Sequence, residues 1–204
     1  VSFVGMRTFL CLGGPRGTEH RCSTGRRGVP GRVLEWRVVL LLLPPSEGKS
    51  APTRGKPLDL GSLSFPVLTP GRDEALDALV ALCSSDATAA AEVLGLGPTQ
   101  TELAARNAGL RTAPTARAEQ IYTGVVYDAL DAASLDAAAR RRLRRVAVTS
   151  SVFGLVRLAD RIPSYRLSGD TTLPGLGPVA AHWRRHLGEA VAELSGERRP
   201  TARP

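Results

Sequence analysis

The stretch VVLLLLPPSEGKS, residues 38–50, decides the fold. Residues 38–43 form an unbroken apolar run, and Pro44 and Pro45 follow it directly. A run of this length is typical of a strand buried on both faces, since a lone helix usually needs about ten residues or more. The prolines end the strand because proline has no backbone N–H to donate. We therefore expect an α/β protein in which the polar loop 46–49 leaves the end of an interior strand, where such folds often place their sites.

The same loop matches a phosphate-binding loop only in part. Gly48, Lys49 and Ser50 fit the end of that motif, but Leu43 stands where its leading glycine belongs. A P-loop is therefore excluded. On this stretch alone, the simpler interpretation is a core strand followed by a solvated loop.

The composition is that of a globular protein with one substantial core. The chain has 204 residues, of which 43% are hydrophobic and 23% charged. Its three cysteines, Cys11, Cys22 and Cys83, show no paired spacing, which argues against a disulfide framework or a zinc site. No stretch approaches the roughly 18 apolar residues that a membrane span needs. We expect a cytoplasmic protein with no cofactor, no metal and no membrane partner, monomeric by default.

The net charge of +8 is unevenly distributed. Residues 1–37 carry seven arginines against Glu19 and Glu35, so +5 lies in this segment and +3 in the rest. This balance permits a nucleic-acid partner without requiring one. Because residues 1–37 lack a sustained apolar period, we expect a disordered basic extension there, one domain at 38–195 and a disordered tail at 196–204.

A second apolar run repeats the design of the first. Residues 146–148 are β-like, and the hydroxyl-rich turn 149–154 follows them. We expect this turn to start a helix that reaches Val156. Within the residues that follow, two cations and a tyrosine could line a cleft for an anion. The alternative is a structural pair between Arg157 and Asp160, which at a surface would contribute about 0–1 kcal/mol.

Helical patterns account for much of the remaining chain. Apolar spacing predicts a helix at 73–84, and Asp86 can cap a second helix that Gly95 closes. Thr99 can cap a third helix, and a last one is expected at 179–194. These segments predict a layer of short helices over the sheet.

Two further patterns each have a structural and a functional interpretation. Helix 135–145 ends in five arginines around Leu143, which indicates a solvated helix end first and a phosphate-binding patch second. His182 and His186 have the four-residue spacing of metal-binding helices. Two arginines lie between them and no glutamate does, so we predict no metal site there.

Three stretches taken together resemble one family. They are PPSEGK at 44–49, YTGVVYDAL at 122–130 and SSVFGLVRLADRIPSYRLS at 150–168. In order and spacing they are similar to the YaaA-type peroxide-stress proteins, in the branch whose first motif reads PPSEGK. The resemblance covers residues 38–194 and implies a compact, mixed α/β (α+β) fold whose central sheet is covered by short helices, with a positively charged cleft.

The resemblance also implies a function. Members of this family are cytosolic and are associated with survival of hydrogen peroxide, with lowered free intracellular iron as the protective effect. A helix-hairpin-helix-like element in the family is linked to binding duplex and distorted DNA. Lys49, Arg157 and Arg166 are the cations that we expect to contact phosphate, which gives affinity without sequence choice. The other motif residues expected around the cleft are Ser46, Glu47, Tyr122, Gly124, Tyr127, Ser151, Gly154, Asp160 and Tyr165.

The chain departs from the family at its end. Family members continue past the last helix with another strand and two further motifs, whereas this chain stops at Pro204. We therefore expect the C-terminal part of the fold, and part of the cleft, to be missing.

Three functional hypotheses remain open on these residues. The first is a non-enzymatic stress protein that binds DNA through the cleft. The second is an enzyme in which Lys49, Tyr122, Tyr165 and Arg166 surround a small anionic substrate. The third is an inactive remnant. The sequence shows no convincing nucleophile–base pair, which favours the first hypothesis over the second.

Overall fold

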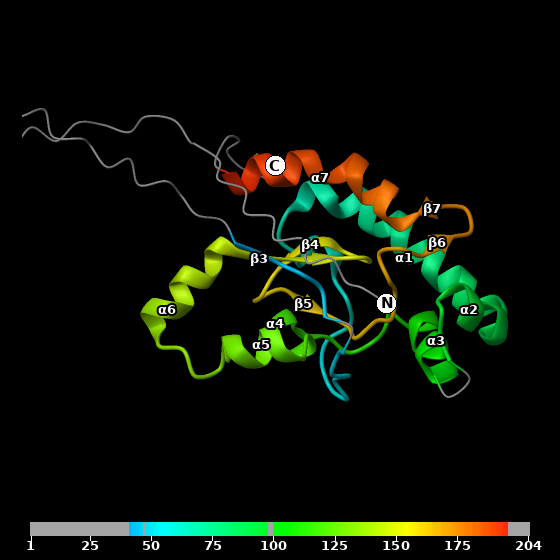
Figure 1. Ribbon diagram of the computed structural model, residues 1–204, viewed down its shortest axis with the longest axis horizontal. Helices are drawn as coiled ribbons and strands as arrows, with labels where there is room; N and C mark the ends of the chain where they lie inside the picture. Colours follow the sequence, from blue (N-terminus) through cyan, green and yellow to red (C-terminus); the bar gives the residue numbers. More distant parts are fainter. Residues whose placement is uncertain (1–40, 47, 98–99, 196–204) are drawn as a thin grey trace, which may run out of the picture.

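The computed structural model describes residues 41–46, 48–97 and 100–195 (Figure 1). The predicted basic extension 1–37, the predicted tail 196–204 and Glu47 lie outside the described residues. Within them the chain is a mixed α+β protein with small sheets and short helices, as the sequence predicted. None of its described helices combines the length and the apolarity that a membrane crossing requires.

The main sheet has three strands in the order β1-β3-β4. The strand β1 pairs in parallel with β3, and β3 pairs in antiparallel fashion with β4. These strands are β1 (Leu41–Leu43), β3 (Val146–Ser150) and β4 (Gly154–Arg157). The prediction that the first strand is buried on both faces is wrong for β1, because Leu41 is 41% exposed and Leu42 and Leu43 are only half-buried.

The turn after β3 makes a hairpin instead of the predicted helix. Its first residues are held by Ser150, whose Oγ accepts the backbone N–H of Phe153 at 3.0 Å. Gly154 then takes a left-handed conformation, with φ of 71°. A Cβ at this glycine would lie 2.6 Å from the ring of Trp183, so no side chain fits. Leu155 and Val156 are both buried, which a strand in the middle of the core allows and a short surface helix would not.

Among the described residues, two smaller sheets and three short 3-10 helices connect the larger elements. The small sheets pair β2 (Ala116–Arg117) with β5 (Arg161–Ile162) and β6 (Thr172–Leu173) with β7 (Gly177–Pro178). The 3-10 helices are η1 (Leu60–Ser62), η2 (Pro66–Leu68) and η4 (Leu143–Arg145).

The described residues include seven α-helices. They are α1 (Thr69–Ser85), α2 (Ala87–Val93), α3 (Thr101–Ala108), α4 (Ala118–Ile121), α5 (Val125–Leu130), α6 (Ala137–Arg142) and α7 (Val179–Ser195). The predicted cap of α2 is confirmed, since Asp86 Oδ1 accepts the N–H groups of Thr88 at 2.8 Å and Ala89 at 3.2 Å. Thr99, the predicted cap of α3, lies outside the described residues.

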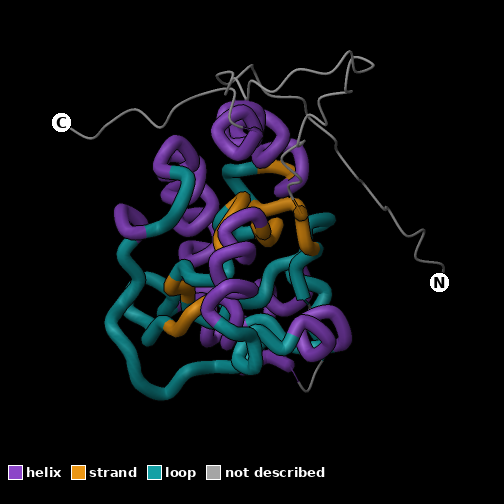
Figure 2. The backbone as a smooth tube through the Cα atoms, turned by 90° about the vertical axis from the view of Figure 1, so that its left-hand side faces the viewer, coloured by secondary structure: helices purple, strands orange, loops and turns teal. Residues whose placement is uncertain are grey.

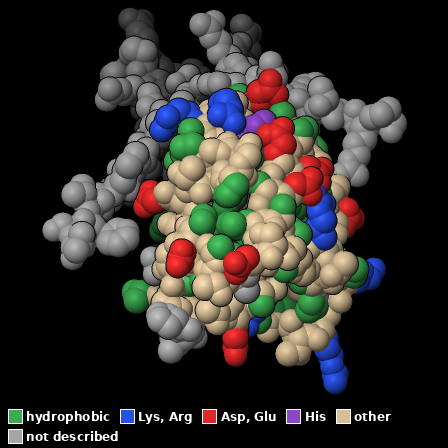
Figure 3. Space-filling view, turned by 90° about the vertical axis from the view of Figure 1, so that its right-hand side faces the viewer, with side chains coloured by type: hydrophobic (Ala, Val, Ile, Leu, Met, Phe, Trp, Pro, Cys, Tyr) green, Lys and Arg blue, Asp and Glu red, His purple; other side chains and the backbone are tan. Residues whose placement is uncertain are grey.

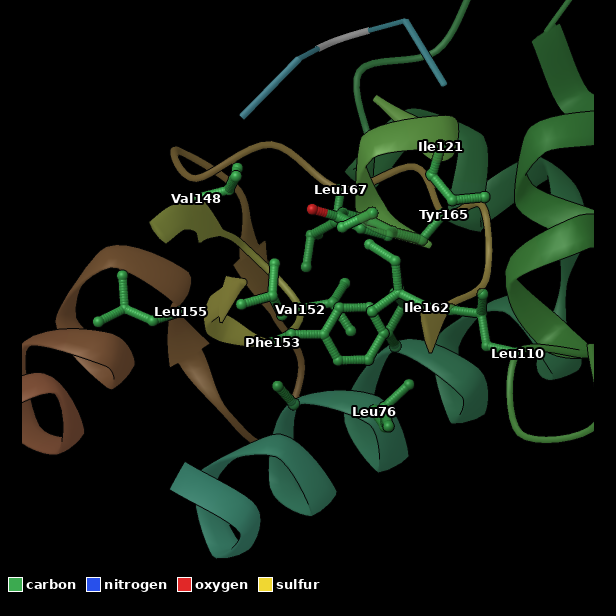
Figure 4. Packing of buried hydrophobic residues seen from close by; sticks show 14 of the residues in the cluster. Leu76, Leu110, Ile121, Val148, Val152, Phe153, Leu155, Ile162, Tyr165 and Leu167 are labelled. Carbon is green, nitrogen blue, oxygen red and sulfur yellow. The ribbon is translucent and has the colours of Figure 1, made fainter. Parts of the chain in front are cut away.

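The helices cover the strands from different sides. In Figure 1, α1 and α7 run together along one side of β3 and β4, while α4, α5 and α6 lie on the other. Figure 2 shows the strands enclosed by helices and loops. The core between α1 and the hairpin contains Leu76, Phe153, Ile162 and Tyr165, all buried (Figure 4).

One charged residue lies inside this core. The side chain of Arg72, on α1, has no exposed surface. Its guanidinium donates to the carbonyls of Phe153 at 3.0 Å, Leu155 at 2.8 Å and Ser64 at 2.7 Å. Burial lowers its pKa to about 10, and the charge of Asp160 opposes that change. Arg72 therefore ties the β3–β4 hairpin to α1 as a buried cation.

Candidate functional site

The loop after β1 is joined to the turn between α4 and α5. Ser50 N donates to Ile121 O at 2.8 Å, and Thr123 N donates to Gly48 O at 3.2 Å. Ser46 Oγ also donates to the Thr123 carbonyl. A Cβ at Gly48 would lie 2.7 Å from Thr123 Oγ1, so glycine permits this close approach. Two motifs that are some 75 residues apart in the sequence are thereby fixed side by side.

Three hydroxyl groups behind this loop form a cluster, which we call the tyrosine–serine cluster: Ser150, Tyr122 and Tyr165. The Tyr165 hydroxyl lies 2.8 Å from Ser150 Oγ and 3.1 Å from the Tyr122 hydroxyl. Burial raises the pKa of Tyr122 well above its usual value, and the neighbouring Tyr165 raises it further. Burial also raises the pKa of Tyr165, while its hydrogen bonds to Ser150 and Tyr122 oppose the shift. These tyrosines are therefore neutral near pH 7 and act as hydrogen-bonding groups, not as bases.

Tyr127 extends the aromatic wall. Its ring stacks on Tyr122, with centroids 5.2 Å apart and planes 23° apart. Its hydroxyl donates to the Pro44 carbonyl at 2.6 Å, which ties α5 to the end of β1. Gly124, at φ of 100°, makes the turn that leads from Tyr122 into α5.

Lys49 lies over two of these rings. Its Nζ is 4.4 Å from the centroid of Tyr165 and 5.6 Å from that of Tyr122, and it donates to the Ser46 carbonyl at 2.5 Å. A cation over an aromatic face is stabilised by the quadrupole of the ring. The ammonium group is thereby positioned at the wall of a pocket.

We call this cavity the Lys49 pocket. Its volume is about 350 Å³, and it is lined by Gly48, Lys49, Gln100, Leu103, Arg106, Ser164, Tyr165 and Arg166. Three of these residues are cations, and none of the described lining residues is acidic. The Nε of Arg166 is buried and has no hydrogen-bond partner within the described part of the chain. An anion in the Lys49 pocket would therefore be close to cations from two segments, Lys49 on the loop after β1 and Arg166 after Tyr165.

Asn107 fixes the backbone of Arg166. Its side-chain amide is buried, donates to Arg166 O at 2.7 Å and accepts from Arg166 N at 2.9 Å. This two-point contact joins α3 to the segment that carries Tyr165 and Arg166. As a result, Arg106 on α3 lies on the same pocket as Arg166.

A second pocket lies on the other side of Tyr122 and has a different charge. It has a volume of about 440 Å³ and is lined by Arg117, Glu119, Gln120, Tyr122, Thr123, Tyr127, Asp128, Asp131, Ala132, Ala133 and Arg140. Its cations are matched by acids, and Glu119 itself lies 3.4 Å from Arg117 and 3.7 Å from Arg140. This mixed-charge pocket is a weaker candidate for an anion.

The predicted cation Arg157 does not line the Lys49 pocket. It lines a third cavity, of about 200 Å³, together with Arg117, Glu119, Arg140, Leu143, Arg144, Leu158 and Ala159. Its guanidinium lies 5.0 Å from the ring centroid of Phe65 and donates to the Arg144 carbonyl. The structure thus brings Lys49 and Arg166 together and places Arg157 elsewhere.

The remaining motif residues of the hairpin have partners within the fold. Asp160 accepts from Ser64 Oγ at 2.8 Å, Ser64 N at 3.2 Å and Arg157 N at 2.9 Å, so it contacts the backbone of Arg157 in place of its guanidinium. Ser151 Oγ donates to Leu167 O at 2.7 Å. Gly154 packs against the ring of Trp183. These residues hold the hairpin in place and do not face the Lys49 pocket.

Several pocket residues escaped sequence reasoning. Arg106 is one exposed arginine among many, and no local pattern marks it. Asn107 acts through Arg166, a partner that is remote in sequence. Ser150 stood in the quoted motif SSVFG, and the hydroxyl-rich turn was the signal that could have identified it.

Comparisons with known proteins agree with this arrangement of motifs. A family model described as "Peroxide stress protein YaaA" matches residues 39–201. A UPF0246 protein of Streptomyces coelicolor is 53% identical over 160 residues, which are 78% of this chain and 62% of that protein. UPF0246 proteins of Corynebacterium efficiens and Corynebacterium glutamicum are 46% and 42% identical over 76% and 77% of this chain, and 62% and 63% of their own lengths. The chain therefore spans less than two thirds of the curated relatives that it matches.

Proposed function

Because the chain belongs to the YaaA peroxide stress protein family, we propose that it acts in the response to hydrogen peroxide by binding DNA phosphates at the Lys49 pocket. The observation that carries this proposal is the charge of the pocket wall. Lys49, Arg106 and Arg166 converge on one cavity without an acidic neighbour among its described lining residues. Cations arranged in this way bind the phosphate backbone and give affinity without reading the sequence.

The arrangement supports phosphate contact more strongly here than elsewhere on the described surface. The arginines of α6 and η4 are numerous, but Arg140 pairs with Glu119, and Arg144 lines the third cavity together with that same carboxylate. The mixed-charge pocket carries three acids. Arg166 lines the pocket beside Lys49 and Arg106, and its charge adds to the attraction for phosphate.

A binding titration tests the proposal. Fluorescence anisotropy with a bulged DNA duplex is measured over a series of salt concentrations, for the wild type and for the triple variant K49A/R106A/R166A. The control is R141A/R142A/R145A, which removes the same charge from exposed arginines outside the pocket. Each lost phosphate contact lowers the magnitude of the slope of log K against log [salt] by about 0.9. We therefore expect the magnitude of the slope to fall by up to about 3 in the pocket variant and to change little in the control.

Two outcomes contradict the proposal. Equal losses in both triple variants would mean that binding follows total charge. A loss confined to the control would move the interface to the arginine run of α6 and η4, the phosphate patch that the sequence left as a second interpretation.

A small anion is the second candidate for the same pocket. The volume of about 350 Å³ favours a ligand that is small enough to enter, and Tyr165 of the tyrosine–serine cluster lines the pocket. Calorimetry with inorganic phosphate and with a nucleoside monophosphate distinguishes the two. Saturable binding lost in K49A, with duplex binding unaffected, would favour the enzyme hypothesis.

The protective effect on free iron is the last part of the proposal. We expect cells that lack this protein to show more free iron during hydrogen peroxide exposure than cells that express it. Low-temperature electron paramagnetic resonance on chelated whole cells measures that quantity, and K49A/R106A/R166A tests whether the Lys49 pocket is needed.

A further inference from the structure

A second cluster of chemically active side chains lies where α1 crosses α7. His182 and His186 come from one face of α7, and Glu74 comes from α1. Glu74 Oε2 lies 3.7 Å from His182 Nδ1 and 4.0 Å from His186 Nε2, and one ligand atom of each residue lies within 4.8 Å of the others. The sequence predicted no metal here because two arginines and no glutamate lie between the two histidines; in the fold, α1 brings Glu74 to them.

The hydrogen bonds of His182 fix which ring nitrogen is available. Its Nε2 lies 2.9 Å from the Gly71 carbonyl, which can only accept, so Nε2 carries the proton. The lone pair is therefore on Nδ1, which is buried and has no hydrogen-bond partner among the described residues. A histidine that ligates a metal commonly donates its other N–H to a backbone carbonyl in this way.

The cluster is accessible from solvent on one side. His182 is fully buried, whereas the side chains of His186 and Glu74 are 26% and 56% exposed. In Figure 3 a histidine side chain reaches the surface between acidic and basic ones.

We propose that Glu74, His182 Nδ1 and His186 Nε2 form a binding site for a divalent transition-metal ion. Two imidazoles and one carboxylate are typical ligands of Zn²⁺ and Fe²⁺ in sites that keep a position open for water or substrate. Ligand atoms around such an ion are about 3.3 Å apart at metal–ligand distances near 2.1 Å. The distances from Glu74 Oε2 exceed this separation by under about 1 Å, and no pair of ligand atoms exceeds it by more than about 1.5 Å. The half-exposed Glu74 side chain and the partly exposed His186 side chain can both move to close these gaps.

The test uses the purified full chain, freed of metal by chelation. Isothermal titration with Zn²⁺, and visible absorption with Co²⁺ as a spectroscopic probe, are carried out on the wild type, E74Q and H186N. The matched control is E92Q, which makes the same change at an exposed glutamate of α2. We expect saturable Zn²⁺ binding in the wild type and in E92Q. Bound Co²⁺ should show the visible absorption bands that are typical of a low coordination number. We also expect a loss of more than about 100-fold in E74Q and H186N, since loss of a mere outer-shell partner already costs 10–100-fold.

Thermal stability gives an independent readout. With Zn²⁺ at about 100 times its dissociation constant, the melting temperature of the wild type should rise by about 5–10 °C, and that of E74Q should not. E74Q changes an exposed side chain, so it keeps the proposal falsifiable even if H186N fails to fold. Wild-type protein without saturable Zn²⁺ binding, or variants that bind as tightly as the wild type, would overturn the metal site.

Discussion

The β3–β4 hairpin and the loop that carries Lys49 are both rich in motif residues, yet they use them differently. At the hairpin, polar groups turn inward: Arg72 of α1 binds three carbonyls, Asp160 after β4 binds the Arg157 backbone, and Ser151 binds the Leu167 carbonyl. Around Lys49, cations line an open pocket instead. A motif can therefore be necessary for the fold without being part of the site, and variants should separate the two roles.

The largest loss of stability is expected at Arg72, whose side chain is buried in the core. Replacing Arg72 by alanine leaves the carbonyls of Ser64, Phe153 and Leu155 without a donor in the core. We expect the free energy of unfolding to fall by about 3–5 kcal/mol, the usual cost of breaking a buried polar contact from one side. Urea denaturation measures it. R54A, at an exposed position, should stay within about 0.5 kcal/mol of the wild type, and comparable values for the two would refute the role of Arg72.

A glycine in the hairpin tests its packing against α7. G154A adds a Cβ where the Trp183 ring lies 2.6 Å away, and it keeps a φ of 71° that alanine adopts poorly. We expect a loss of about 2–4 kcal/mol from strain and overpacking. G175A is the matched control, because Gly175 has a φ of 77° with nothing within 4 Å of the added Cβ. If both variants lose the same stability, backbone strain alone explains G154A and the contact with Trp183 does not matter.

The sequence predicted some of these features and not others. The Asp86 cap and the last helix follow from local chemistry, and the structure confirms them. The hairpin was predicted as a helix because a short apolar run does not distinguish a strand from a helical segment. Whether this segment forms a strand or a helix depends on its contacts with Trp183 and Arg72, which are remote in sequence.

The composition of the pocket could be predicted even less. Lys49 and Arg166 were identified as phosphate-binding cations, but the sequence could not place Arg157 in a different cavity. Arg106 joins the pocket only because Asn107 holds the Arg166 backbone. The sequence also could not predict that Glu74 lies beside two histidines, because this proximity depends on how α1 crosses α7.

Alkaline pH tests whether the tyrosines around the pocket are neutral structural groups. Burial raises the pKa of Tyr122, Tyr127 and Tyr165 above their usual value. The unfolded state therefore loses these protons first, above about pH 10, and stability contributed by the neutral hydroxyls is complete below that pH and falls above it.

Y127F should remove one of these three contributions. Its lost hydrogen bond to the Pro44 carbonyl should lower stability at neutral pH by about 1 kcal/mol. Between about pH 9 and pH 11 the variant should then lose less further stability than the wild type. Urea melts at both pH values give the two differences, and an equal alkaline loss would mean that Tyr127 does not contribute to it.

The most direct measurement compares Lys49 with Arg157, one cation at a time. In salt titrations with a DNA duplex, the account predicts that K49A lowers the magnitude of the log K against log [salt] slope by about 0.9, the value of one phosphate contact. R157A should leave that slope unchanged, because its guanidinium lies on Phe65 and on the Arg144 carbonyl, outside the Lys49 pocket. A slope that falls in R157A as much as in K49A, or in neither variant, would contradict the Lys49 pocket as the phosphate site.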